Sequence, residues 1–216
     1  MTKPKTPFSR RGILLLTLFL LWTWLIRTVD VQPVGPGGTT VGFGALNSRF
    51  HECTGVHMGI YTATDWLGLV PIAVCLLFAG LGLLQLIRRR KLRKVDGDIL
   101  LLGIYYTLVI GCYLAFEMYP VNYRPILIAG RLEASYPSST TLLVLSVMPT
   151  LTFQAQRRWK HAAVIRLLTT LFSVAMILGR LISGVHWLTD IVGSLLLSGG
   201  LYCLYRAAVL LWEQKS

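Results

Sequence analysis

The sequence predicts an all-α integral membrane protein, a bundle of six transmembrane helices with both termini in the cytoplasm. Hydrophobic residues make up 54% of the chain and charged residues only 14%, which is too apolar for a soluble globular domain. Apolar runs long enough to cross a bilayer alternate with short loops that are rich in Lys and Arg. Because these runs lack the alternation of a β-barrel, helices are the structure that satisfies their backbone groups in lipid.

We expect a single membrane domain over residues 1–216. Its spans are predicted at roughly 12–29, 65–87, 99–116, 138–154, 162–179 and 188–212. The first span follows Lys3, Lys5, Arg10 and Arg11, as in a signal peptide, but no small-residue cleavage site comes after it. We therefore interpret it as an uncleaved helix that starts in the cytoplasm.

This topology puts the basic loops on one side of the membrane and three other loops, at 30–64, 117–139 and 179–187, on the outer side. The stretch VQPVGPGGTTVGFGAL in the first of these loops is rich in Gly and Pro, so we expect no long helix there. The same loop carries His51, Cys53 and His57, whose spacing fits no standard metal motif. We interpret it as a cover of the outer face, and its role as a lid over a site stays open.

The formal net charge of +12 would point to nucleic acid in a soluble protein. Here the basic residues cluster beside apolar runs, most densely in RRRKLRK at 88–94, as topology anchors do. We therefore expect membrane lipids as partners and no nucleic acid. The four cysteines show no zinc-binding spacing, so we also expect no metal.

The most informative stretch is GRLISGVHWLTDIVGS, residues 179–194. It lies between two apolar runs and contains three ionisable residues, Arg180, His186 and Asp190. Ionisable residues at a bilayer edge are costly and mark a functional site by default. His186 and Asp190 are four residues apart, so on a helix they would face the same way. The carboxylate could then accept the imidazole N–H and leave the other nitrogen free as a base or nucleophile. Arg180 carries a planar fork suited to phosphate oxygens.

Two further stretches on the outer side complete a pattern. They are EMYPVNYRP at 117–125 and PSST at 137–140, and GRLISGVHWLTD at 179–190 follows them. In order and spacing they resemble the motifs K-x6-R-P, P-S-G-H and S-R-x5-H-x3-D of the type 2 phosphatidic acid phosphatase superfamily. The third motif is strong, with Gly184 in its usual place, and the first two are degenerate. The resemblance covers the chain from roughly the third span onward.

The resemblance implies an enzyme, a hydrolase of lipid phosphates. The predicted topology places its site on the extracytoplasmic side, and for so compact a chain we expect the plasma (inner) membrane. The resemblance implies that His186 attacks phosphorus and forms a phosphohistidine, that Asp190 orients the imidazole, and that water then hydrolyses the intermediate. It implies that the phosphoryl oxygens are bound by Arg124, Arg180, Ser138 and Ser139, the serines acting with the start of the fourth helix. The family's chemistry requires no cofactor.

Two positions depart from the motifs, with Glu117 in place of the lysine and Thr140 in place of the second-motif histidine. In the family that histidine protonates the leaving oxygen, which threonine cannot do near neutral pH. Its loss should matter most for an alkoxide leaving group, whose conjugate acid has a pKa of roughly 15–16, as for water. It should matter little for a phosphate monoester, whose second pKa is about 6. We therefore expect a polyprenyl diphosphate or a similar lipid pyrophosphate as substrate.

Several alternatives stay open. Glu117 could donate a proton, pair with one of the site arginines or hold a divalent cation; together with Thr140 and Gly184 it is a candidate for lining the site. The chain could be a headgroup or phosphoryl transferase, in which an acceptor other than water takes the group. It could also be a lipid-phosphate binding or transport protein that has lost the chemistry.

Overall fold

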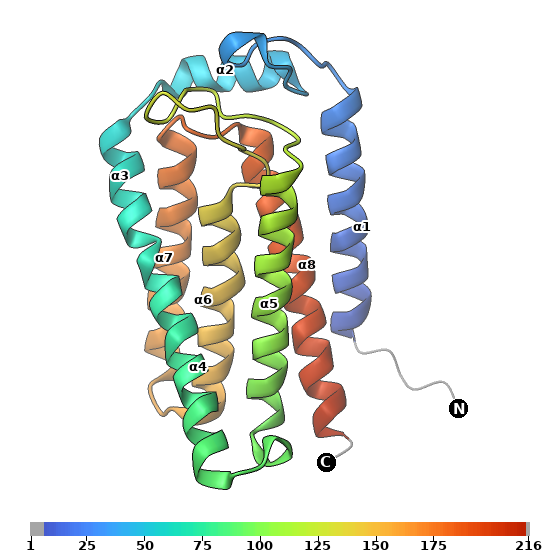
Figure 1. The fold of residues 1–216 in the computed structure, drawn as a ribbon, viewed down its shortest axis with the longest axis vertical. Helices are drawn as coiled ribbons and strands as arrows, with labels where there is room; N and C mark the ends of the chain where they lie inside the picture. The colour runs from blue at the N-terminus through green and yellow to red at the C-terminus, as the bar shows by residue number, and fades with distance from the viewer. Residues whose placement is uncertain (1–6, 215–216) are drawn as a thin grey trace.

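The fold is a bundle of long helices with one short helix lying across its end (Figure 1). The computed structural model describes residues 7–214. Its α-helices are α1 (Pro7–Thr28), α2 (Gly44–Thr54), α3 (Met58–Leu67), α4 (Leu69–Arg89), α5 (Gly97–Met118), α6 (Ser139–Arg158), α7 (Ala162–Ile182) and α8 (Leu188–Glu213). Two 3-10 turns, Pro36–Gly38 and Leu92–Lys94, lie in connections, and within residues 7–214 the structure has isolated β-bridges but no strand. The all-α prediction is thus confirmed.

Five helical segments are long and apolar enough to cross a membrane: α1, α3–α4 as one segment (Met58–Arg89), α5, α7 and α8. The sixth expected span corresponds to α6, which is 20 residues long but much less apolar. Half of its residues are buried, including Ser146, Thr150 and Gln154, because it runs inside the bundle among the other helices (Figure 1). A membrane crossing by α6 and cytoplasmic termini stay predictions, and Lys3 and Lys5 lie outside the described residues.

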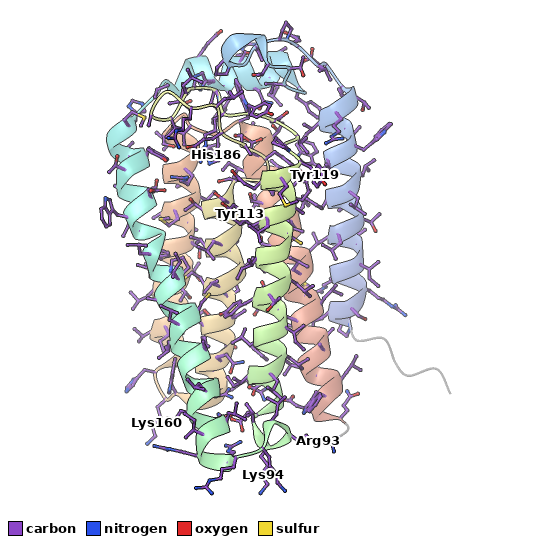
Figure 2. All side chains as sticks on the ribbon, viewed as in Figure 1. Arg93, Lys94, Tyr113, Tyr119, Lys160 and His186 are labelled. Carbon is purple, nitrogen blue, oxygen red and sulfur yellow. The ribbon has the colours of Figure 1, made fainter. Side chains whose placement is uncertain are left out.

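The interpretation of residues 30–64 as one loop is wrong for two stretches. The Gly- and Pro-rich part is irregular as expected, but α2 begins at Gly44 and α3 begins at Met58, seven residues before the predicted span. Tertiary contacts hold α2 in place: Asn47 Nδ2 donates to the carbonyl of Gly42 (2.8 Å) and to Thr189 Oγ1 (3.0 Å). The helix covers the end of the bundle that carries His186 (Figures 1 and 2).

The other two outer loops are shorter than predicted because the helices before them continue further. α5 extends to Met118, so Glu117 lies in its last turn. α7 extends to Ile182, so Arg180 is a helical residue and the loop shrinks to residues 183–187. The basic side chains of Arg93, Lys94 and Lys160 lie at the opposite end from His186, Tyr113 and Tyr119 (Figure 2). This is the separation that the predicted topology requires.

Candidate active site

The predicted site residues meet at the α2 end of the bundle, supplied by three parts of the chain. Arg124 comes from the connection between α5 and α6, and Arg180 from the last turn of α7. His186 and Asp190 come from the third part, His186 from the loop before α8 and Asp190 from the first turn of α8. All four are buried, with exposed fractions of 7%, 1%, 3% and 0% in that order. Charged groups this well buried need partners or a ligand, because removing them from water is costly.

The imidazole of His186 contacts a serine that the motifs did not indicate. Ser135 Oγ lies 3.1 Å from His186 Nδ1 and also donates a short hydrogen bond to Asp190 Oδ2. The distance from His186 Nδ1 to Asp190 Oδ2 is 3.7 Å, too long for a direct hydrogen bond. Because the serine proton is used on the carboxylate, its oxygen accepts from Nδ1–H. The chain His186–Ser135–Asp190 therefore keeps the proton on Nδ1 and the lone pair on Nε2.

Asp190 faces His186, but not through the helical spacing that the sequence predicts. His186 precedes α8, whose N-cap is Trp187, so the two residues do not share a helix and that expectation is wrong. Asp190 lies in the first turn, where its Oδ2 accepts the backbone N–H of Trp187 (2.9 Å). Its Oδ1 accepts Asn122 Nδ2 at 3.4 Å. These contacts, with the helix N-terminus itself, stabilise a buried carboxylate beside the imidazole.

Burial and nearby positive charge keep the His186 imidazole neutral. Desolvation is the main reason that the pKa of His186 falls to about 4, and the charges of Arg124 and Arg180 lower it further. Asp190 opposes these effects and does not outweigh them. His186 Nε2 is buried and has no hydrogen-bond partner. A neutral imidazole with a free, buried Nε2 beside two guanidinium groups is suited to attack an electrophile that carries negative charge.

Some guanidinium nitrogens of Arg124 and Arg180 lack a hydrogen-bond partner. Arg124 Nε lies 3.1 Å from Glu133 Oε2 without the alignment of a hydrogen bond, and Arg124 Nη1 has no partner. Arg180 Nη1 donates weakly to Thr64 Oγ1 (3.4 Å) and lies 3.8 Å from Asp65 Oδ1, while its Nε has no partner. The three unpartnered nitrogens are buried donors, and each would cost free energy unless an anion accepts from it.

The remaining predicted residues have other surroundings. Ser138 is the N-cap of α6 and fully buried, but its hydroxyl donates to Thr141 Oγ1 (3.0 Å). Ser139 and Thr140 begin α6 and line a cavity of about 320 Å³. Glu117 is exposed, and the carboxylates that lie beside the arginines are instead Glu133 and Asp65.

Gly184 is required by the backbone at the site. Its φ is +69°, a conformation that favours glycine. A Cβ at this position would lie 2.0 Å from the carbonyl oxygen of Gly55. The loop before His186 therefore packs directly against the connection between α2 and α3, where the His57 N–H also donates to the carbonyl of Ser183 (3.0 Å). The segment interpreted as a cover of the outer face thus contacts the loop that carries His186.

The histidines of that segment do not form a metal site. His57 Nε2 lies 2.9 Å from the carbonyl of Thr54, and the His51 ring lies 5.7 Å from the ring of Trp187. Within residues 7–214 no group of three His, Cys, Asp or Glu side chains is placed to hold a metal ion. The cysteine of the segment, Cys53, is exposed with a free thiol.

Sequence reasoning missed Ser135 and Asn122, the two side chains that contact Asp190 from the α5–α6 connection. Asn122 lies inside the first motif stretch at a position that the motif leaves open, and Ser135 lies between the first two motifs. No spacing rule connects position 135 with position 186, because the contact exists only after the connection folds over the start of α8. It also missed Tyr61 of α3, whose ring lies against both arginines.

Comparisons with known proteins bear on the fold and on the family. The structure is similar to the crystal structure of a transmembrane PAP2 type phosphatidylglycerolphosphate phosphatase from Bacillus subtilis, with a TM-score of 0.59. The two sequences are 18% identical over 95% of this chain and 96% of that chain, so the likeness shows a shared fold. No curated protein matches the sequence. The family model of the PAP2 superfamily matches residues 111–213, which include Arg124, Arg180, His186 and Asp190. Over these residues the chain is similar to the PAP2 superfamily.

Proposed function

We propose that the protein is a lipid phosphatase in which His186 attacks the terminal phosphoryl group of a membrane lipid. The observation that carries this proposal is the buried, unpartnered Nε2 of His186 beside the unpartnered nitrogens of Arg124 and Arg180. A tetrahedral phosphoryl group supplies what these atoms lack, an electrophilic phosphorus for Nε2 and oxygen acceptors for the guanidinium groups.

The reaction runs in two displacements. Nε2 of His186 forms a bond to phosphorus while the bond from phosphorus to the lipid oxygen breaks, and the lipid leaves with the electron pair. Ser135 and Asp190 stabilise the positive charge that develops on the imidazole, because the Nδ1 proton is already directed at them. Water then attacks the phosphohistidine, phosphate departs, the water proton passes to solvent and the imidazole is neutral again. Arg124 and Arg180 hold the transferred oxygens in both steps.

The site supports a leaving group that needs no proton. Thr140 occupies the position of the family's acid on the first turn of α6, and a threonine hydroxyl cannot act as an acid near neutral pH. Glu117 is exposed, and the nearer carboxylates, Glu133 and Asp65, lie beside the guanidinium groups of Arg124 and Arg180. The substrate we favour is therefore a polyprenyl diphosphate, whose leaving group is a phosphate monoester with a second pKa of about 6.

An apolar cavity beside the site could hold the hydrocarbon part of such a lipid. The cavity of about 320 Å³ is lined by apolar residues of α4, α5 and α6 and reaches Ser139 and Thr140. A second apolar cavity of about 520 Å³ lies along α4 and α5 towards the opposite end of the bundle. A long hydrocarbon chain on this side of the bundle would lead to the start of α6, where the phosphoryl site begins. On the predicted topology the site faces the extracytoplasmic side of the plasma membrane.

The test is phosphate release by the purified protein in lipid nanodiscs. Three substrates are compared: a polyprenyl diphosphate, phosphatidic acid and phosphatidylglycerol phosphate, the last named for the structural neighbour's activity. We expect the diphosphate to be hydrolysed fastest, and release to be lost in His186→Ala. Equal or faster release from either monoester would contradict the leaving-group argument. Lipid binding without release would support a binding protein, and transfer of the phosphoryl group to an alcohol in place of water would support a transferase.

A further inference from the structure

Arg124 and Arg180 are two buried positive charges that repel each other in the ligand-free site. The two positive charges are near enough to act on each other, and both side chains are buried. Their carboxylate neighbours are imperfect partners, since Glu133 is misaligned and Asp65 is 3.8 Å away and mostly exposed. Something else must keep two like charges side by side before an anion arrives.

The aromatic ring of Tyr61 lies against both guanidinium groups. Its centroid is 5.0 Å from Cζ of Arg180 and 5.8 Å from Cζ of Arg124, each within the range of a cation–π contact. Tyr61 comes from α3 and therefore lies outside residues 111–213, the part that the family model matches. It is half-buried, so its ring is partly shielded from water, which strengthens such contacts.

Contacts between α3 and α7 place the ring where it is. A Cβ on Gly179 would lie 2.6 Å from Thr64 Cγ2, so the absence of a side chain at position 179 lets the two helices approach. Thr64, three residues after Tyr61 and so on the same face of α3, accepts from Arg180 Nη1. The start of α3 is held by the hydrogen bond from the His57 N–H to Ser183, in the loop that leads to His186.

We propose that Tyr61 is a positioning residue of the phosphate site, whose ring holds the two guanidinium groups in the arrangement that a phosphoryl group binds. The ring faces stabilise both cations while the site is empty, and they leave Nε and Nη1 of Arg124 and Nε of Arg180 free to donate. The site is thereby preorganised for the anion, and binding does not have to order two long side chains first. This proposal rests on the proposed function only for the identity of the ligand.

The test uses three variants of the full-length protein in nanodiscs. Tyr61→Leu removes the ring, Tyr61→Phe keeps it and removes the hydroxyl, and Trp66→Leu is the matched control. Trp66 is also an aromatic residue of α3 but is 71% exposed. The readouts are the Kd of inorganic phosphate, measured by calorimetry and by thermal stabilisation, and KM and kcat for lipid hydrolysis.

We expect Tyr61→Leu to weaken phosphate binding and to raise KM by about tenfold, the effect of losing roughly 1.4 kcal/mol of cation–π stabilisation. We expect kcat to change less than KM, and Tyr61→Phe and Trp66→Leu to match the wild type. Unchanged phosphate affinity in Tyr61→Leu, or an equal loss in Tyr61→Phe, would overturn the proposal. Because phosphate affinity needs no turnover, a wild-type protein that binds phosphate but hydrolyses no lipid would refute the proposed function and still give a result on Tyr61. A wild-type protein that does not bind phosphate would refute both.

Discussion

The two ends of the bundle both contain buried charge, and they use it differently. At the end opposite His186, Asp98 accepts hydrogen bonds from Arg158 Nη1 (2.8 Å) and Nη2 (3.0 Å) and from Arg157 Nε (3.2 Å). Asp96 accepts from Arg89 Nη1 (2.6 Å) and from Gln85 Nε2 (2.8 Å). No side-chain atom of these residues is left buried without a partner.

At the α2 end, His186, Arg124 and Arg180 together have four buried nitrogens without a partner. The two ends have similar residue types, so composition does not distinguish them. The difference lies in hydrogen bonding. The network of Asp96 and Asp98 joins α4, α5 and α6 through bonds among its own members, although Arg206 Nε at the same end is also buried without a partner. At the α2 end the unpartnered donors of both arginines lie with the free lone pair of His186 Nε2. Substitutions at the two ends should therefore separate stability from activity.

The largest expected effect on activity comes from removing the nucleophile. His186→Ala should lower kcat/KM by about 10⁴-fold or more, because the mechanism proposed above forms the covalent intermediate on His186 Nε2. The thermal midpoint should fall by little, since the imidazole makes only one side-chain hydrogen bond, to Ser135. Measurement of both quantities on the same preparation checks this. An active His186→Ala protein would mean that the unpartnered nitrogens do not mark the reacting centre.

The second effect concerns the side chain that connects His186 to Asp190. Ser135→Ala should lower kcat by about 10²-fold, because Nδ1 loses its partner and the neutral imidazole can place its proton on Nε2. Ser198→Ala is the matched control: this serine is equally buried on α8, but its hydroxyl bonds only to backbone carbonyls within that helix. Equal kinetics for the two variants would show that Ser135 has no special role.

The third effect is a shift in pH dependence. The folded-state pKa of His186 is lowered from 6.5 to about 4, so the imidazole stays unprotonated in mildly acidic buffer. The acid limb of kcat/KM, corrected for the substrate's own second pKa of about 6, should therefore lie nearer pH 4 than pH 6.5. Because the unfolded chain takes up this proton first, His186 should also make stability fall as the pH drops from 6.5 towards 4. An acid limb at the ordinary histidine pKa would contradict the buried, neutral imidazole.

The smallest effect on activity is expected at the opposite end. Asp98→Asn removes the charge shared by Arg157 and Arg158 and should lower stability by about 2–3 kcal/mol, below the usual range for a buried pair because the arginines are partly exposed. The kcat of the folded protein should stay within about twofold of the wild type, as expected for a residue far from the chemistry. Denaturation in detergent and activity at low temperature measure the two effects. A large loss of kcat in an Asp98→Asn protein of unchanged stability would show that the two ends do not separate stability from activity.

Much of this arrangement follows from the sequence, because hydrophobic runs in a bilayer can hardly adopt another structure. The predicted spans match α1, α5, α7 and α8 to within a few residues, apart from the start of α1. Topology also brings Arg124, Arg180, His186 and Asp190 together, since it places their loops on the same side. For α6 the hydropathy signal is weak, because a helix surrounded by other helices can carry Ser, Thr and Gln on buried positions.

The rest depends on contacts that no local pattern encodes. α2 is held by Asn47 against residues at the start of α8, 142 positions away in the chain. Ser135 reaches His186 only because the α5–α6 connection folds over the start of α8. Glu117 was the carboxylate expected near the arginines, but the paths of the backbone place Glu133 and Asp65 there. Periodicity predicts helices, whereas these placements follow from how irregular segments pack between them.

We propose that the unpartnered nitrogens of Arg124 and Arg180 hold a phosphoryl group while His186 Nε2 attacks it. The most direct test is to mix the protein with a polyprenyl diphosphate labelled in its terminal phosphate, denature it rapidly, and locate the label by peptide mass spectrometry. We expect a labelled phosphoryl group on the peptide that contains His186, and no label in His186→Ala. Turnover of the lipid with no protein-bound phosphate, or with the label on another residue, would contradict it.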